Sequence, residues 1–389
     1  MLRSLYSGIS GLRAHQTMLD TTGNNIANVN TAGFKSSTTQ FQDTLSQLTQ
    51  GATTPQAANG GGNPAQVGLG VQVAGVTTNF TQGSAQNTGR ASDMMVSGDG
   101  FFVTRQGTQN VLTRAGAFDF DGNGRLVSPD GGIVQGWLAV DGVLPTGGAL
   151  QDISLARAGV APGEGTTAAT VGGNLPSDAA VGTSLVQDRE VFAADGTSRT
   201  LTLTFTRTAA GWDVAGNDGA GSGATSLAFT DGRLASGGNM TVGGIQVNLG
   251  AVTSYADLKT VSVTGQNGRS AGVLESYTLG ADGTLTGTFS NGTQRAIAQV
   301  VLGNVNNPAG LQKTGGSGYT VTANSGAIEF GAPGTAGMGS LSGGMLEMSN
   351  VDLSQEFTNL IVAQRGFQAN ARIITTSDEV LQELANLKR

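Results

Sequence analysis

The residues with the most suggestive spacing for chemistry lie between Asp119 and Asp130. Four of them occupy the first, third, fifth and sixth positions of a calcium-binding EF-hand loop, and Asp130 stands at the twelfth. These four are Asp119, Asp121, Asn123 and Gly124. An EF-hand needs a helix on each side, whereas segments 111–113 and 132–134 have the apolar composition of strands. We therefore interpret the loop as a β-hairpin turn, with calcium binding as the alternative.

Other catalytic chemistry has few candidates. His15 is the only histidine and cysteine is absent, so Ser-His-Asp and Cys-His catalysis and thiolate metal sites lack their residues. We expect His15 to be a packed or solvated helix residue. A pair of glycosidase carboxylates is an alternative, but most acidic residues lie in Asp-Gly turns, where their role is conformational. We predict that the chain is not an enzyme and uses no metal or cofactor.

The composition restricts the partners. The 389 residues include 63 glycines, only 12% are charged, and the net charge of -7 comes without a basic cluster. Nucleic-acid binding requires such a cluster, so we do not expect it. No segment reaches the about 18 apolar residues of a membrane span, so we expect no membrane insertion. The amino-terminal segment lacks a secretory signal, which predicts a cytosolic protein or export with an uncut amino terminus.

Apolar residues recur at seven-residue spacing at both ends of the chain. On a helix this spacing forms a seam that packs against another helix. Stripes at the two extremes predict a subunit that polymerises, while an ordinary helix packed on its own domain is the alternative. Gly366 costs about 1 kcal/mol relative to alanine inside a helix, so we expect it to permit a close approach. The stripe residues are Leu2, Leu5, Ile9, Leu12, Leu19 and Ile26, then Leu353, Leu360, Phe367, Ile374, Leu381 and Leu384.

Between the stripes the pattern indicates β-structure. Apolar and polar residues alternate, and Asp-Gly and Asn-Gly dipeptides recur as tight-turn signals. We predict an α+β multidomain fold with a coiled-coil-like inner domain of terminal helices and two mainly antiparallel β domains, the outer inserted into the inner. The predicted parts are a helical domain (1–35 with 350–389), a linker or arm (36–70 with 331–349), an inner β domain (71–150 with 271–330) and an outer β domain (151–270). Phe41, Leu45 and Leu48 could give the arm a short helix.

Two terminal motifs resemble those of a known family. The segments 24–35, 349–357 and 363–370 are similar to the signatures of the axial proteins of the bacterial flagellum, most closely the hook proteins. Segment 96–103 also resembles that family's outer β domain, and residues 151–270 are the least similar part. A β insertion of about 120 residues favours hook over rod subunits. The motif residues are Asn24, Asn25, Asn28, Thr31, Gly33, Phe34, Asn350, Asp352, Gln364, Arg365 and Asn370.

The resemblance implies a structural subunit of the flagellar hook. Such a subunit would polymerise into a hollow, flexible helical tube, a universal joint that transmits motor torque to the filament. The implied partners are copies of the chain itself, the distal rod protein, the hook cap protein, the hook-filament junction protein and the flagellar type III export apparatus. The implied location is extracellular, in the hook and basal body, without a cleaved signal peptide. A distal rod-type axial protein and a secreted β-rich adhesin are the alternatives.

Overall fold

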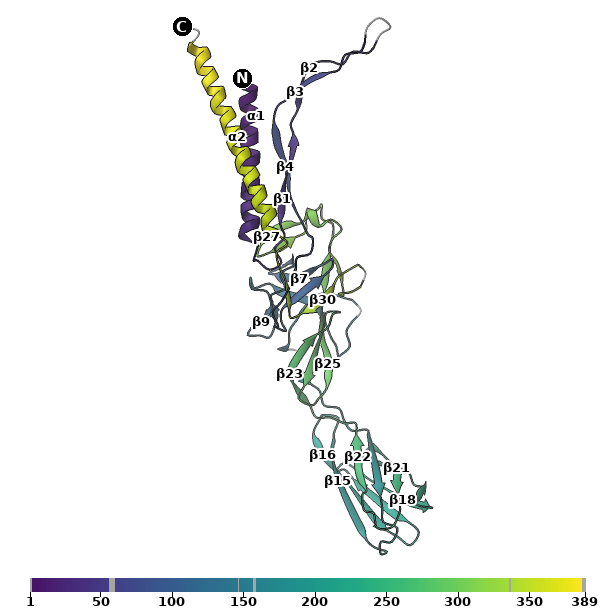
Figure 1. Cartoon of the computed structure of the whole chain (residues 1–389). Coiled ribbons are helices and arrows are strands. Elements are labelled where there is room, and N and C mark those ends of the chain that lie inside the picture. The colour runs from purple at the N-terminus through teal and green to yellow at the C-terminus, as the bar shows by residue number, and fades with distance from the viewer. Residues whose placement is uncertain (1, 56–59, 146, 157–158, 336, 387–389) are drawn as a thin grey trace. The chain divides into compact units, whose positions relative to one another are not determined.

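The computed structural model describes residues 2–55, 60–145, 147–156, 159–335 and 337–386. The chain forms two compact units. The first comprises Met1–Ser154, Thr278–Leu285 and Ala296–Arg389, and the second comprises Leu155–Tyr277 and Thr286–Arg295. The fold is mostly β, with one long helix near each end of the chain, as predicted (Figure 1).

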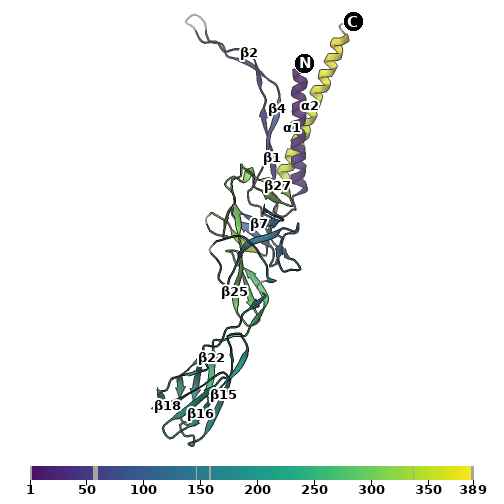
Figure 2. The same ribbon diagram turned by 180° about the vertical axis from the view of Figure 1, so that it is seen from behind.

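The helices are α1 (Leu2–Ala27) and α2 (Leu353–Asn386). They lie side by side and antiparallel, with the amino end of α1 beside the carboxyl half of α2 (Figures 1 and 2). The carboxylate of Asp352 accepts the N–H groups of Ser354 and Gln355 at 2.8 and 3.2 Å, so Asp352 caps the amino end of α2. The first helix ends at Ala27, before the end of the predicted helical segment 1–35, and turns follow it.

A two-stranded arm follows α1. Strand β1 (Ser37–Asp43) pairs antiparallel with β4 (Val71–Thr78), and β2 (Ser46–Gln50) pairs with β3 (Ala65–Gly68). The suggested short helix at Phe41, Leu45 and Leu48 is wrong. Phe41 and Leu48 lie in strands, because cross-strand pairing with residues 65–78 supplies the backbone hydrogen bonds that a helix would supply locally.

The rest of the first unit is a β domain. Its central strands are ordered β11-β7-β8-β28-β27, and Phe101, Val103, Leu112, Val305 and Tyr319 form a buried cluster. Its strands are β5 (Ala85–Asn87), β6 (Met94–Ser97), β7 (Phe101–Gln106), β8 (Gln109–Thr113), β9 (Asp119–Phe120), β10 (Leu126–Val127), β11 (Ile133–Leu138), β12 (Gln151–Asp152), β26 (Leu302–Asn304), β27 (Gln312–Gly315), β28 (Gly318–Thr320), β29 (Glu329–Gly331), β30 (Ser340–Gly343) and β31 (Met345–Glu347).

The expected linker at 331–349 is wrong for the part of that segment that the structure describes. Strand β30 pairs with β6, and β31 pairs with β5. Some of the glycines there permit close packing or a left-handed backbone. A Cβ at Gly339 would lie 2.4 Å from the carbonyl oxygen of Ser97, and Gly344 has a φ of +72°. Glycine content that suggested flexibility therefore belongs to a packed segment.

The second unit is a β domain built around its own core. Its main sheet is ordered β15-β16-β17-β18-β19-β21-β14-β22, with β20 beside β21. Leu201, Leu203 and Phe205 are fully buried and alternate with threonines, the pattern of a half-buried strand. The strands are β13 (Val160–Ala161), β14 (Ala168–Asn174), β15 (Ser184–Phe192), β16 (Ser198–Arg207), β17 (Trp212–Asn217), β18 (Ser222–Thr230), β19 (Arg233–Ser236), β20 (Asn239–Val242), β21 (Ile245–Thr253) and β22 (Ser262–Gln266); β23 (Gly272–Leu279), β24 (Thr284–Phe289) and β25 (Gln294–Val300) contribute residues to both units.

Candidate assembly surface and its anchor

The line of contact between α1 and α2 runs through small residues. Gly8, Gly11 and Ala14 are buried on α1. A Cβ at Gly11 would lie 2.6 Å from the side-chain oxygen of Asn370, so a larger residue there would force the Asn370 side chain to move. On α2, a Cβ at Gly366 would lie 2.5 Å from the His15 ring, which confirms that this glycine permits a close approach. His15 is therefore a packed helix residue.

Polar pairs set the register of the helix pair. The Asn25 amide donates to the Glu356 carboxylate at 3.0 Å, and the Ser4 and Ser377 hydroxyls lie 3.5 Å apart. Gly11 faces Asn370 between these two pairs. From one of these three contacts to the next, the α1 residue number falls by seven or fourteen and the α2 residue number rises by the same amount. The seam is thus a heptad repeat, but one of small and polar residues.

The apolar stripes lie mostly beside this seam and not in it, although Ile374 lies against Gly8, where an added Cβ would be 3.3 Å from its side chain. Leu353 is 40% exposed, Phe367 38% and Leu381 36%, and Leu5, Leu12, Leu19, Ile26, Leu360 and Ile374 are partly buried. Ile9 and Leu384 are exposed, and the side chain of Leu2 lies outside the described residues. The reason is steric, because glycine opposite a small or polar residue brings the backbones closer than two leucines allow.

Both stripes lie on the same side of the helix pair. Leu5 follows Ser4, Leu12 follows Gly11 and Phe367 follows Gly366, each one residue past a seam position. One residue is a turn of about 100° around a helix. In an antiparallel pair this turn leads to the same side on both helices. We call this side the apolar face: Leu5, Ile9, Leu12, Leu19, Ile26, Leu353, Phe357, Leu360, Phe367, Ile374 and Leu381.

The arm covers the opposite side of α1. The N–H of Val71 donates to the Ser10 hydroxyl at 3.2 Å, and the Thr39 hydroxyl donates to that of Thr21 at 3.1 Å. Ser10 and Thr21 each precede a buried position, so they lie on the side away from the apolar face. These contacts of the arm use hydroxyl and backbone groups, and the side chains of the apolar face stay exposed or only partly buried.

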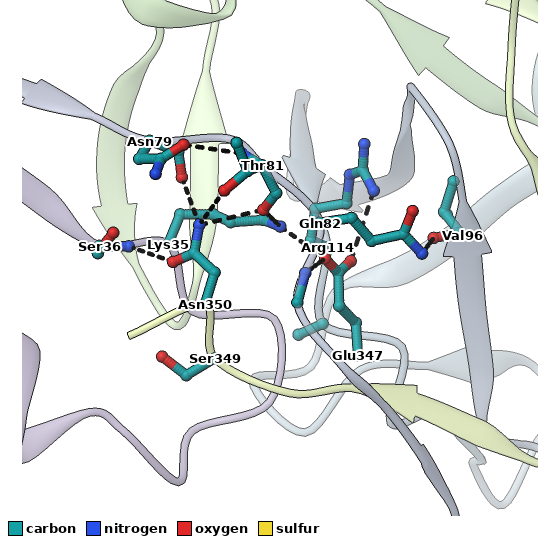
Figure 3. A network of polar contacts seen from close by, with 12 residues as sticks. Lys35, Ser36, Asn79, Thr81, Gln82, Val96, Arg114, Glu347, Ser349 and Asn350 are labelled. Atoms are coloured by element: carbon teal, nitrogen blue, oxygen red, sulfur yellow. Dashed lines mark hydrogen bonds and ion pairs between the residues drawn. The ribbon is translucent and has the colours of Figure 1, made fainter. Parts of the chain in front are cut away.

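A buried ionic cluster anchors the chain between the helices and the β domain (Figure 3). The Lys35 ammonium lies 2.6 Å from a Glu347 carboxylate oxygen, and the Arg114 guanidinium lies 3.4 Å from the other oxygen. The Lys35 and Glu347 side chains are fully buried, and that of Arg114 is 4% exposed. Glu347 also accepts the N–H of Gly83 at 2.8 Å. One carboxylate thus joins the segment after α1, the segment before α2 and the β domain.

The electrostatics of the cluster follow from its burial. Desolvation lowers the pKa of Lys35, and the hydrogen bond and charge of Glu347 oppose that shift. Desolvation also lowers the pKa of Arg114, again opposed by Glu347. Nearby, burial raises the pKa of Tyr319 to about 12. Two cations share one anion here, so the carboxylate is the group whose loss leaves the most charge uncompensated.

Several motif residues surround this anchor. Asn350 accepts the N–H of Ser36 at 2.8 Å and donates to the carbonyls of Asn79 and Thr81 at 2.9 and 3.0 Å (Figure 3). It therefore ties the segment before α2 to the segment after α1.

Residues of the amino-terminal motif shape the turn after α1. Gly33 has a φ of +69°, and a Cβ there would lie 2.4 Å from the backbone of Ala115. Phe34 lies 5.3 Å from the Lys313 ammonium. Asn28 donates to Asn24 and accepts from Thr31. The motif residues Gln364 and Arg365 lie on α2, away from this turn, and are exposed.

The calcium-like loop forms a β-hairpin between β9 and β10. One Asp121 oxygen accepts the N–H groups of Asn123 and Arg125 at 2.9 and 2.8 Å, and the other pairs with the Arg125 side chain at 2.7 Å. These bonds lower the pKa of Asp121, with the backbone bond from Arg125 the largest cause. Asp121 thus has a turn-stabilising role. The described residues contain no group of three or more potential metal ligands.

The sequence pattern did not reveal Glu347 or Arg114 as site residues. A faint signal existed for Glu347, because it is a lone charge among Met345, Leu346 and Met348. A charge inside an apolar run is costly unless it is paired. Among the described residues, no helix has the length and apolar character needed to cross a membrane.

Family models match three parts of the chain. Residues 5–35 match "Flagella basal body rod protein", residues 95–163 match "Flagellar hook protein FlgE/F/G D1 domain", and residues 342–387 match "Flagellar basal body rod FlgEFG protein C-terminal". The first and last matches contain the terminal motifs, and the second contains much of the first unit's β domain.

Full-length relatives agree with these matches. The chain is 39% identical to the flagellar hook protein FlgE of Borreliella burgdorferi and 34% identical to that of Treponema pallidum, over 100% of each chain. It is 35% identical to FlgE of Salmonella typhimurium, over 99% of this chain and 100% of that protein. The crystal structure of Helicobacter pylori FlgE2 matches 68% of this chain and 100% of its own, with a TM-score of 0.44 and 13% identity.

Proposed function

Because the chain belongs to the flagellar hook protein family, we propose that it polymerises through the apolar face into a hollow helical tube. The observation that supports this most is the one-sided placement of both stripes. Phe357, Phe367 and Leu353 are 51%, 38% and 40% exposed, although α2 packs along α1. Apolar surface of this extent is the mark of a protein interface. A neighbouring copy would cover it.

The tube would act as a universal joint that transmits motor torque. Helices packed along their apolar faces would form a stiff inner wall, in the manner of coiled coils. The ionic cluster of Lys35, Glu347 and Arg114 would carry torque from that wall to the β domain, because its buried bonds fix the segments leading to both helices. The sparse charge of the chain, 12% of residues, would let neighbouring β domains slide without locking into ion pairs.

Partners and location follow from the family. Hook proteins are structural components of the bacterial flagellum, so we propose a structural, non-enzymatic role for this chain. We further propose export by the flagellar type III apparatus without cleavage of the amino terminus, and contacts with the distal rod, hook cap and hook-filament junction proteins. We also propose that residues 151–270 form an outer domain inserted into an inner domain of 71–150 with 271–330.

Electron microscopy of purified chain at rising concentration tests the polymer. The wild type should form hollow tubes, and Phe357→Ser with Phe367→Ser should form none at the same concentration. The control is Gln368→Ser, an exposed polar position of the same helix, which should assemble like the wild type. All three should melt alike as monomers, because surface substitutions cost within about 0.5 kcal/mol. Normal tubes from the double variant would contradict the proposal.

A further inference from the structure

The outer part of the arm is an exposed element with unusual composition. Residues 44–69, which we call the arm tip, contain no charged side chain. Within the part of the arm tip that the structure describes, Leu45 is 83% exposed, Leu48 56% and Val67 46%. A two-stranded hairpin is marginal in water, and exposed strand edges are often protected by charged side chains, which the arm tip lacks. The arm tip therefore has the character of a segment that another surface covers.

An apolar cavity lies at the base of the first unit's β domain, beside the end of α1. It has a volume of about 470 Å³, and its walls include Phe34, Val111, Ala117, Pro129 and Tyr319. This size is within the usual range of about 300–1,000 Å³ for binding pockets.

The charges at this cavity are already engaged. The Lys313 ammonium donates to the Ser37 hydroxyl at 2.8 Å, and the Asp130 carboxylate accepts from Ser128 and Gln106. These groups have neutral partners, and the mainly apolar walls of the cavity suit an uncharged, apolar occupant.

The arm tip and the cavity lie at opposite ends of α1. Ser37 contacts Asn25, Thr39 contacts Thr21, and Val71 contacts Ser10, so the arm runs back along α1 toward its amino end. The distance from Asn25 to Ser10 along the helix is roughly 22 Å at 1.5 Å per residue. The arm tip begins at that far end, whereas the cavity is lined by Asn24, Asn28 and Thr31. An arm tip in this cavity must therefore belong to another copy.

We propose that the arm tip of one copy enters the cavity of a second copy, with Leu45, Leu48 and Val67 as its apolar contacts. The inference rests on the proposed polymer and names one of its contacts. Two different surfaces meet, so the contact is head to tail and each copy offers both a free arm and a free cavity. Contacts of this kind form rings when the rotation between copies closes and helical assemblies when it does not, and the proposed tube is of the second kind.

Disulfide trapping tests the contact cleanly, because the chain contains no cysteine of its own. The variant with Leu48→Cys and Ala117→Cys carries one thiol on the arm tip and one in the cavity. Assembled tubes of this variant, oxidised and run on a non-reducing gel, should give a ladder of dimers, trimers and longer chains. Each single variant should stay monomeric, and tubes co-assembled from the two singles should give dimers only.

A mismatched pair controls for random collision. Val181 is 70% exposed and lies in the second unit, so Leu48→Cys with Val181→Cys should not link. Tubes without a ladder, equal ladders from both pairs, or a fast-migrating linked monomer would overturn the inference. If the wild type forms no tubes, the proposed polymer itself has failed, which is a separate outcome.

A second variant tests the energetic role of the arm tip. Leu48→Ser with Val67→Ser should raise the concentration needed for tube formation roughly tenfold or more, the equivalent of losing about one buried aliphatic side chain. Melting of the monomer should not change, because both residues are exposed in the single chain. An unchanged assembly concentration would count against the inference.

Discussion

Replacing Glu347 with glutamine should destabilise the first unit strongly. The substitution keeps an acceptor for the Gly83 N–H but removes the negative charge that lies 2.6 Å from Lys35 and 3.4 Å from Arg114. Removing one partner from a buried ion pair typically costs about 3–5 kcal/mol, because the remaining charge is left uncompensated. For a unit of this size, such a loss lowers the melting temperature by roughly 10 °C.

The assay is thermal and urea unfolding of the monomer at pH 7, with a matched surface pair as the control. Asp152 pairs with Arg105 at 2.6 Å in the same unit, but the two side chains are 29% and 39% exposed. Asp152→Asn should therefore cost about 1 kcal/mol or less.

A double variant separates charge from packing. Lys35→Met combined with Glu347→Gln leaves only the Arg114 cation, so its cost should fall below the sum of the two single costs by more than about 0.5 kcal/mol. Equal losses from Glu347→Gln and Asp152→Asn, or strict additivity in the double variant, would refute the reasoning.

Three further predictions concern the seam, alkaline pH and salt. Gly366→Ala should destabilise the helix pair by about 1–3 kcal/mol in circular-dichroism melts, because its Cβ would press on His15. Gly23→Ala, with open space around it, should stabilise α1 by up to about 1 kcal/mol. A change of the same sign at both positions would contradict this reasoning. Because the pKa of Tyr319 is raised to about 12, it contributes folding free energy that is fully present below pH 10 and is lost as the pH rises toward about 12. The wild type should therefore lose up to roughly 3 kcal/mol of unfolding free energy in this range, and Tyr319→Phe should not. Identical pH profiles of the two proteins would exclude that role. Bending stiffness of the tubes, measured by microscopy of their fluctuations, should depend little on salt, and a several-fold change between low and high ionic strength would count against the role given to sparse charge.

Periodic features of the fold were predictable from the sequence. Both helices, the cap at Asp352 and the buried alternation at Leu201, Leu203 and Phe205 follow from spacing and capping rules, because these signals are local. The role of Gly366 was also predictable, since a glycine inside a helix is costly without a close neighbour.

Contacts between distant segments were not predictable. Glu347 meets Lys35 across more than 300 residues of chain, and no local pattern shows such a pairing. The polar seam between α1 and α2 was not predicted for a related reason. The apolar heptads at Leu12 and Phe367 are stronger sequence signals than the glycine and asparagine heptads beside them. Glycine at 331–349 suggested a linker, since composition does not distinguish freedom from tight packing.

The polar heptad seam restricts how the two helices can change in length. Removing the seven residues 364–370 of α2 would keep every remaining side chain on its own side of the helix, since seven residues complete almost two whole turns. Removing a single residue would rotate everything beyond it by about 100° and move the apolar side chains, which lie one residue past the seam, into the seam itself. Viable length variants of these helices should therefore differ by whole heptads.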